Sequence, residues 1–344
     1  MMQTLVTLEI KGDGKRRLEE LLAAAIEKLA HDSSVREAFL RHPLLQSVPP
    51  SALLGKISRK RAARVIEAGL LSSDDGRELI GDALFGRGRE IETTIPLALL
   101  LGELGLMPPS LSPGLPPVQI LFENEDCLAV YKPHDLPSAP LRSDETDSAV
   151  HRTLAYFAKL PILRDNPLEP GLMHRLDTGT SGALLFVKSA EAFTRIGKIW
   201  NSGQVKKDYR ARVALEPGAP RLTTGRIELL LGHDAKSKRK MRVIRGPQDA
   251  KLIRGDAQRA LSEILRVNPL AQESLDVSIR IETGVHHQIR ATLSHLGAPL
   301  LGDSIYGGRE EARLWLHAWK ILIPTGAGKS LEIVAPLPAD WPTG

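Results

Sequence analysis

The sequence predicts an α+β protein, with a small, mainly helical N-terminal region before a larger domain of strands and helices. Residues 18–29 place apolar side chains at helical spacing. From residue 118 onward, short apolar runs of strand length (VQILFE, CLAVYKP, GALLFVK, DYRARVALE, SLDVSIRIE) mix with two helical segments. Because these runs do not alternate regularly with helices, a mixed domain is favoured over a βαβ repeat.

The composition is that of an ordinary globular protein: 344 residues, 42% apolar and 25% charged. No apolar run approaches the roughly 20 residues that cross a bilayer, and the start, MMQTLVTLEIKGDGKRR, lacks a secretory signal. We therefore expect a cytoplasmic protein with no membrane partner. The single cysteine, Cys127, excludes an internal disulfide and is expected in the core. A net charge of +5 suggests a polyanionic partner.

The N-terminal region reads as two parts. Residues 1–48 form a helical extension, because RRLEELLAAAIEKLA places apolar side chains on one face, either for the core or for a partner. These side chains are Leu18, Leu21, Leu22, Ala25 and Leu29. In residues 49–95, ISRKRAARVIEAGLL predicts a helix from Ser58 to about Gly69.

The helix that begins at Ser58 carries a dense cationic surface made by Arg59, Lys60, Arg61 and Arg64. Such a surface is either a solvated helix face or a contact for RNA phosphates. The Pro-, Gly- and Ser-rich residues 96–117 predict a semi-rigid linker, with the second domain at 118–344.

The stretch HRLDTGTSGALLFV, residues 174–187, places Asp177 on a turn-forming run directly before a buried strand. An aspartate in this position either accepts hydrogen bonds from its own turn or offers its carboxylate to a substrate.

HRLDTGTSG resembles the catalytic loop of the RluA-type pseudouridine synthases, His-Arg-Leu-Asp followed after two residues by Thr-Ser-Gly. Other segments resemble motifs of this family in the same order. They are NEDCLAVYKPHDLPSAP with its Lys132-Pro133 turn, VKKDYRARV, TGVHHQIRATLSHLGAPLLGDSIYGG, ARLWLHAWKI and APLPADW. The resemblance spans residues 118–344. It implies the fold of the family, a mixed, mostly antiparallel central sheet with flanking helices, and isomerisation of uridine to pseudouridine in rRNA or tRNA without a cofactor.

The resemblance assigns site residues by position. Asp177, Tyr209 and Arg290 are the expected catalytic residues. Tyr209 is expected to stack on the base and to assist the final deprotonation, and Arg290 to pair with Asp177 and keep it ionised. The expected substrate-binding residues are His174, Arg175, Thr180, Ser181, Lys207, His287 and Gln288. The cationic run KSKRK is expected to contact RNA phosphates through Lys236, Lys238, Arg239 and Lys240, as are Arg59, Lys60 and Arg61. Residues 49–95 also resemble the S-four-type RNA-binding module.

Val285, His286 and Thr292 depart from the family pattern, in which Arg, Thr and His are usual at these places. Thr283 is the expected N-cap of the following helix, with His287, Arg290 and Ser294 on one of its faces. We expect no metal, because the histidine spacing does not match HExxH, and we read GAGKS at 326–330 as a hairpin turn. A monomer is the default.

Two alternatives from other classes remain open. One is a catalytically inactive RNA-binding or ribosome-assembly factor on the same fold. The departures at Val285, His286 and Thr292 favour this alternative. The other is a scaffold whose N-terminal helices bind a protein, which would show no salt-dependent affinity for RNA.

Overall fold

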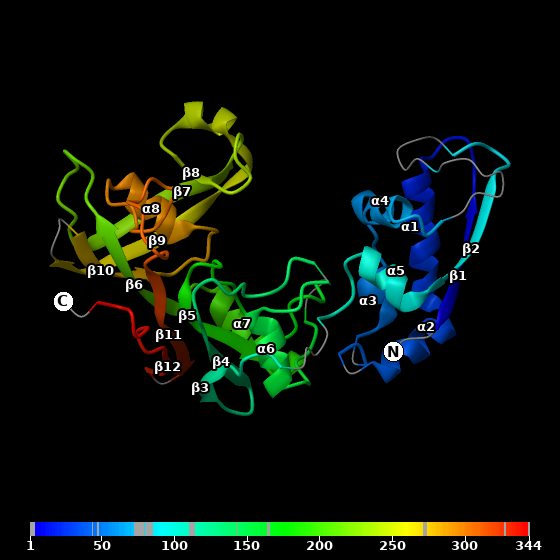
Figure 1. Ribbon diagram of the computed structural model, residues 1–344, viewed down its shortest axis with the longest axis horizontal. Helices are drawn as coiled ribbons and strands as arrows, with labels where there is room; N and C mark the ends of the chain where they lie inside the picture. The colour runs from blue at the N-terminus through cyan, green and yellow to red at the C-terminus, as the bar shows by residue number, and fades with distance from the viewer. Residues whose placement is uncertain are drawn as a thin grey trace. The chain divides into compact units, whose positions relative to one another are not determined.

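The computed structural model describes residues 4–42, 44–46, 48–71, 79, 85–109, 114–142, 144–163, 166–270, 274–326 and 328–342. The chain forms two compact units (Figure 1). The first comprises Met1–Pro117, Ala139–Leu172 and Lys188–Ala190, and the second comprises Val118–Ser138, Met173–Val187 and Glu191–Gly344. Each unit is described separately below.

The first unit begins with a strand rather than a helix. Strand β1 (Leu5–Lys11) pairs antiparallel with β2 (Glu90–Pro96), and alternate β1 residues Val6, Leu8 and Ile10 are buried. The prediction of an all-helical residue 1–48 segment was therefore wrong at its start, where TLVTLEIK has the period-two pattern of a strand. The pairing also joins the predicted parts 1–48 and 49–95 in one hydrophobic core.

The remaining elements of the first unit are helical. They are α1 Leu18–Lys28, the 3-10 turn η1 Leu29–His31, α2 Ser33–Arg41, α3 Pro50–Leu54, α4 Arg59–Glu67, α5 Leu97–Glu103 and α6 Ala149–Tyr156. The predicted apolar face of α1 is buried, and Ser58 caps α4 by accepting a hydrogen bond from the Arg61 backbone N–H. Both helix predictions are confirmed.

The predicted linker at 96–117 differs from the structure in its first half. Residues 97–103 form α5, and Leu97, Leu100, Leu101, Leu104 and Leu106 are fully buried in the core of the first unit. Burial of the five leucines stabilises the helix more than an extended connection would be stabilised. The proline and glycine residues that suggested a linker follow shortly after it. Residues 110–113, later in the predicted linker, lie outside the described residues.

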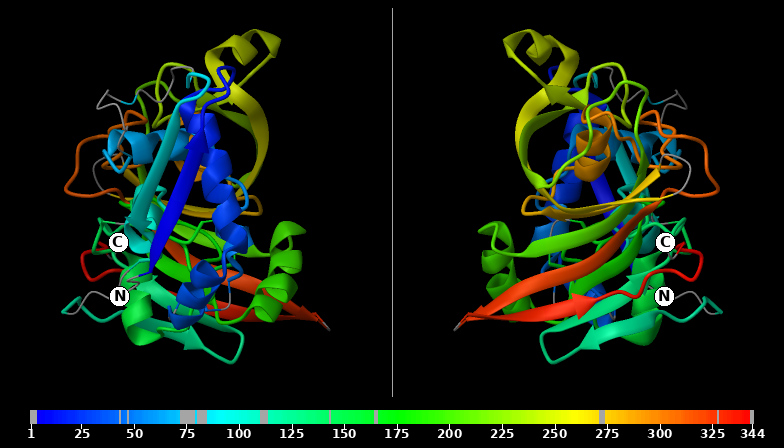
Figure 2. Two further views of the ribbon diagram at one scale, coloured as in Figure 1. Left: turned by 90° about the vertical axis from the view of Figure 1, so that its right-hand side faces the viewer. Right: turned by 90° about the vertical axis from the view of Figure 1, so that its left-hand side faces the viewer.

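The second unit is built on one large mixed sheet (Figure 2). Its strands are β3 Gln119–Glu123, β4 Cys127–Lys132, β5 Ser181–Val187, β6 Lys206–Ala214, β7 Gly225–Asp234, β8 Met241–Ile244, β9 Ile253–Pro269, β10 Ser274–Ile281, β11 Leu316–Gly326 and β12 Lys329–Val334. The order is β3-β4-β5-β11-β6-β10-β9-β7-β8, with β12 paired to β11. Among the pairings of these strands, β5 with β11 is parallel and the others are antiparallel, which confirms the predicted fold class.

Three helical segments flank this sheet: α7 Ala190–Asn201, η2 Pro247–Leu252 and α8 Gln288–His295. Arg195 of α7 pairs with Asp126 in the turn between β3 and β4. Helix α8 lies against β8 and β9. The buried Cys127 and the β11–β12 hairpin, in which Gly326 pairs with Lys329, confirm two further predictions. Of the helices that the structure describes, none combines the length and apolar character that crossing a bilayer requires.

Strand β5 is buried along its whole length, and Gly182 near its start is required for close packing. Gly182 has φ +124°, and a Cβ there would lie 2.2 Å from the Ala318 carbonyl oxygen of β11. No ordinary side chain fits, because the backbone conformation and the space are both unsuitable.

We therefore expect Gly182→Ala to lower the free energy of unfolding by about 2 kcal/mol or more. The matched control is Gly197→Ala in α7, where no heavy atom lies within 4 Å of the added Cβ. That variant should be neutral or more stable by up to about 1 kcal/mol. Urea unfolding of both variants tests the expectation, and equal stabilities would contradict it.

Candidate active site

Asp177 lies on a tight turn that leads into β5. The Asp177 carbonyl accepts a hydrogen bond from the Thr180 N–H at 2.9 Å. Lys132, fully buried at the end of β4, donates from Nζ to the carbonyl oxygens of Pro133, Leu136 and Thr178, at 3.0, 2.6 and 3.0 Å. Burial lowers the pKa of Lys132 to about 7. The Lys-Pro turn thus fixes the residue that follows Asp177.

The Asp177 carboxylate is paired with the guanidinium of Arg290 in α8. Arg290 Nη1 donates to Asp177 Oδ2 at 3.1 Å, while Nε and Nη2 donate to the two oxygens of Asp303 at 2.7 Å each. The Arg290 and Asp303 side chains are 9% and 0% exposed. Burial opposes the charge on Arg290, but Asp303 first and Asp177 second outweigh it and raise the pKa of the guanidinium. The Asp177 side chain is 24% exposed, so a substrate can reach it.

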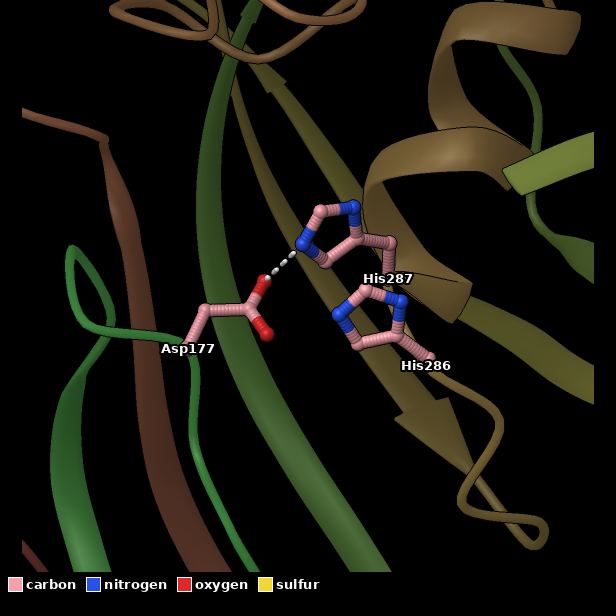
Figure 3. A group of neighbouring side chains, drawn as sticks. All are labelled: Asp177, His286 and His287. Atoms are coloured by element: carbon pink, nitrogen blue, oxygen red, sulfur yellow. Dashed lines mark ion pairs between the residues drawn. The ribbon is translucent and has the colours of Figure 1, made fainter. Parts of the chain in front are cut away.

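His287 also faces the carboxylate (Figure 3). Its Nε2 lies 3.6 Å from Asp177 Oδ2 and 2.8 Å from Arg290 Nη1, and its Nδ1 lies 3.2 Å from the Tyr306 hydroxyl. Burial lowers the pKa of His287 to about 4. The imidazole is therefore neutral near neutral pH.

His286 is exposed and stacks on His287, with ring centroids 3.8 Å apart. Both rings turn a nitrogen toward Asp177 (Figure 3), and the donor atoms of the three residues lie within 4.8 Å of one another. Two imidazoles and a carboxylate suit a transition metal. However, Arg290 Nη1 contacts two of the same donor atoms, Asp177 Oδ2 and His287 Nε2, so a cation already occupies their shared side.

Tyr209 lies on β6 and is only 7% exposed. Burial raises its pKa, and the charge of Asp177 adds to this rise, which places the phenol within the field of that carboxylate. The hydroxyl stays protonated. It can therefore offer a hydrogen bond or an aromatic ring, but not a phenolate base.

Four of the predicted substrate-binding residues have bonding or stacking partners within the folded chain, and three of the four are buried. Ser181, Lys207 and Gln288 are each less than a tenth exposed. Ser181 bonds to His317 and Arg313, while Lys207 Nζ donates to the Thr283 carbonyl at 3.1 Å.

Gln288 and His174 likewise have structural contacts. Gln288 bonds to Thr283, Val285, Leu261 and Ser262. His174 stacks on Trp200 and accepts the Leu185 N–H. These contacts argue for shaping the site rather than touching RNA.

The other predicted contacts differ in exposure. Arg175 is exposed, and its charge acts on His286, whereas Thr180 is 2% exposed. In the turn between β7 and β8, Lys236, Lys238, Arg239 and Lys240 are exposed. In α4, Arg59 and Lys60 are exposed and Arg61 is half-buried, and Arg59 pairs with Glu20 at 3.1 Å.

The predicted N-cap of α8 was wrong. The helix starts at Gln288, and His287 is its N-cap with φ +52°, while Thr283 lies in the preceding turn. The Thr283 hydroxyl instead donates to the Gln288 side chain at 2.8 Å, which closes that turn. The predicted shared face is confirmed, because His287, Arg290 and Ser294 all contact the same neighbour, Tyr306.

Sequence reasoning gave no role to Asp303, Tyr306, Lys132 or His286. The first two stand in the quoted GDSIYG segment, where a buried acid next to a glycine turn was the available signal. His286 was noted as a departure from the family pattern and, with His287 and His295, as a histidine whose spacing does not match a metal site.

The comparisons with known proteins agree with this site. A family model for RNA pseudouridylate synthase matches residues 126–295. Ribosomal large subunit pseudouridine synthase D of Zymomonas mobilis is 27% identical over 303 residues, which cover 84% of this chain and 89% of the relative. An uncharacterized RNA pseudouridine synthase of Bacillus subtilis is 30% identical over 238 residues, which cover 67% of this chain and 72% of the relative. The chain belongs to the RluA-type family of RNA pseudouridine synthases, which are isomerases.

The lowered pKa of His287 predicts a loss of stability in acid. Above pH 6.5 the imidazole is neutral in both the folded and unfolded states. As the pH falls from 6.5 toward 4, the imidazole is protonated in the unfolded chain but stays neutral in the folded site, where its pKa is about 4. The folded state therefore loses stability relative to the unfolded state. At about pH 4.5, this loss should be about 2 kcal/mol for His287.

Urea unfolding at about pH 7 and about pH 4.5 measures this effect in wild type and in His287→Gln. The variant should lose about 2 kcal/mol less than wild type across this interval. An equal loss in both proteins would show that His287 is not held neutral.

Proposed function

We propose that this chain isomerises uridine to pseudouridine in ribosomal RNA, with Asp177 as the catalytic carboxylate. The observation that supports this most strongly is the contact of Asp177 Oδ2 with the buried, Asp303-anchored Arg290, while the carboxylate itself remains 24% exposed. Ribosomal RNA is favoured over tRNA because several relatives carry the name ribosomal large subunit pseudouridine synthase D. A cytoplasmic location fits this substrate.

The reaction exchanges bonds within one nucleotide. The bond from C1′ of the ribose to N1 of uracil breaks, the uracil turns, and a bond from C1′ to C5 forms. The C5 proton passes to solvent and N1 takes up a proton from solvent, so the product is an isomer of the substrate. No electrons are gained or lost, so the conversion requires no redox cofactor. Asp177 either attacks C1′, as carboxylates do in retaining glycosidases, or removes a sugar proton to give a glycal. Both routes need an accessible carboxylate next to the sugar.

The neighbouring residues orient this carboxylate. Arg290 holds one Asp177 oxygen, and because its other nitrogens are bound to Asp303, it cannot swing away without breaking two further bonds. Tyr209 contacts the base through its ring or its neutral hydroxyl. The raised pKa of Tyr209 argues against a phenolate that removes the C5 proton, so solvent or another base takes that proton.

The uridine must leave its stack to reach Asp177, at a cost of a few kcal/mol. Phosphate contacts can offset this cost. We assign them to the exposed cations of the phosphate turn, defined as residues 236–240, and to Arg175. Residues 118–344 are the proposed catalytic domain, and Arg59, Lys60 and Arg61 of α4 make a further proposed RNA contact within 49–95, a segment whose residues 72–78 and 80–84 lie outside the described residues.

Asp177→Asn keeps the shape of the side chain but removes its nucleophilic and basic character. We expect it to abolish tritium release from ribosomal RNA labelled at C5 of uridine, while RNA affinity changes by less than about threefold. Asp256→Asn, an equal charge change at an exposed position of β9, is the matched control and should retain wild-type release. Release by Asp177→Asn at the wild-type rate would sink the assignment of Asp177.

If wild type itself releases no tritium despite salt-dependent RNA binding, the inactive RNA-binding factor becomes the leading explanation. If RNA binding is also missing, the scaffold does.

The phosphate turn should also govern the salt dependence of RNA binding. Replacing Lys238 and Arg239 by Gln removes two phosphate contacts, which should lower the slope of log affinity against log salt by about 1.5. Lys329→Gln at the start of β12, an exposed cation on another hairpin, should leave the slope unchanged. An unaltered slope in the double variant would place the phosphate contacts elsewhere.

A further inference from the structure

Tyr306 is a buried residue that contacts both the phosphate turn and the proposed catalytic arginine. Tyr306 is only 5% exposed. Lys240 Nζ lies 5.4 Å from the centre of its ring, and the central guanidinium carbon of Arg290 lies 5.3 Å from the same centre. A cation within about 6 Å of a ring centre is attracted to the π-electrons. Two like charges therefore share one ring.

The hydroxyl of Tyr306 makes the second connection. It accepts the Met241 N–H, directly after Lys240, at 2.8 Å, and it lies 3.2 Å from His287 Nδ1. Arginine has only donors, so His287 Nε2, 2.8 Å from Arg290 Nη1, must be the nitrogen with the free lone pair. In the neutral ring the proton is then on Nδ1, which donates to Tyr306.

The Tyr306 hydroxyl consequently accepts two hydrogen bonds, one from the phosphate-turn side and one from the active-site side. Its two lone pairs are thereby both used. A displacement of the Met241 backbone would shift the Tyr306 hydroxyl and, with it, the His287 ring that donates to this hydroxyl. The other ring nitrogen of His287 accepts from Arg290 Nη1, so the orientation of that N–H group would change as well.

The backbone of Tyr306 is fixed to the same arginine. The N–H groups of Ile305 and Tyr306 donate to Asp303 Oδ1 at 3.2 and 3.3 Å, and Asp303 holds the Arg290 guanidinium. Ser294 Oγ of α8 donates to the Tyr306 carbonyl at 2.9 Å. Tyr306 cannot shift without moving groups that orient Arg290.

The phosphate turn is ordered at its own base. Asp234 Oδ1 accepts the N–H groups of Lys236 and Ser237 at 2.8 and 3.0 Å, and Asp234 Oδ2 accepts from Arg242. A phosphate bound by Lys240 would neutralise one of the two cations that share the Tyr306 ring. The ring would then attract Arg290 with less competition, and the repulsion between the two cations would fall.

We propose that Tyr306 is a positioning residue that couples phosphate binding at Lys240 to the hold of Arg290 on Asp177. This coupling rests on the proposed function of the same site. RNA docking on the phosphate turn then improves the active-site geometry as well as the affinity. RNA that does not reach Lys240 is bound but turned over slowly.

The test uses the full chain and measures two quantities: RNA affinity, and single-turnover tritium release at saturating RNA. Tyr306→Phe keeps the ring and removes the hydroxyl, and it should slow release about tenfold with affinity within about twofold. Lys240→Gln should weaken binding and also slow release at saturation. Lys238→Gln, the matched control two residues away, should weaken binding only.

The double variant Tyr306→Phe with Lys240→Gln separates coupling from two independent defects. We expect Lys240→Gln to slow release in wild type by more than it does in the Tyr306→Phe background, while its loss of affinity is the same in both. Fully multiplicative losses of rate, or wild-type release by Tyr306→Phe, would overturn the proposal. If Tyr306→Phe does not fold, a Lys240→Gln rate equal to that of Lys238→Gln at saturating RNA would overturn it.

The ¹⁵N resonances of the His287 ring decide the coupling without any turnover. RNA should shift them in wild type and in Lys238→Gln, but not in Lys240→Gln. Absence of tritium release from wild type with this pattern intact would reject the proposed function and retain the coupling. Equal shifts in Lys240→Gln would reject the coupling itself.

Discussion

The buried charge of Arg290 is the constraint on which the proposed active site depends. A guanidinium removed from water needs several acceptors, and a partner lost from such a group costs several kcal/mol. The two carboxylate oxygens of Asp303 are two of these acceptors, and Asp177 and His287 supply the others. One cation thus ties the Asp177 loop, α8 and the 302–308 turn together. The acid that is proposed to react is therefore also a hydrogen-bond partner of the buried arginine.

Buried lysines extend the same principle to the loops around the site. Lys132 and Lys207 are each under a tenth exposed, and their Nζ atoms donate hydrogen bonds to backbone carbonyls. Burial lowers their pKa values to about 7 and about 8. Each ammonium group therefore fixes a loop, and its lowered pKa brings its titration close to neutral pH. Loop carbonyls held in this way are less free to rearrange when RNA arrives.

Residue patterns predicted the local elements better than their partners. The α1 and α4 helices follow from spacing and capping, and β3, β4, β5, β6 and β10 follow from short apolar runs. Strand β1 was missed because the stronger helical pattern after it dominated the segment. Strands β7 and β9 were missed because β7 has only a short apolar run, residues 229–231, and because polar residues interrupt the apolar ones along the 17 residues of β9. Their stability comes from pairing with each other, which no local pattern reveals.

The site shows the same division. Asp177 and Arg290 were identified by their motifs, but they are 113 positions apart, and their contact exists only in the folded chain. Ser181 and Gln288 looked like substrate contacts because they stand in the motifs. Their bonds to the Arg313 side chain and to the Leu261 carbonyl show that both side chains also have partners within the folded chain, which the motifs did not reveal.

The position of β11 has a consequence for how the enzyme is made. This strand, residues 316–326, lies between β5, which the Asp177 loop enters, and β6, which carries Tyr209. A ribosome extends the chain from the N-terminus, and domains fold as their residues emerge. The two halves of the site therefore cannot reach their final separation until a strand synthesised after all of the site residues has been inserted between them. Assembly is delayed to a late stage of synthesis, so a partly made chain would lack an organised site with which to modify RNA.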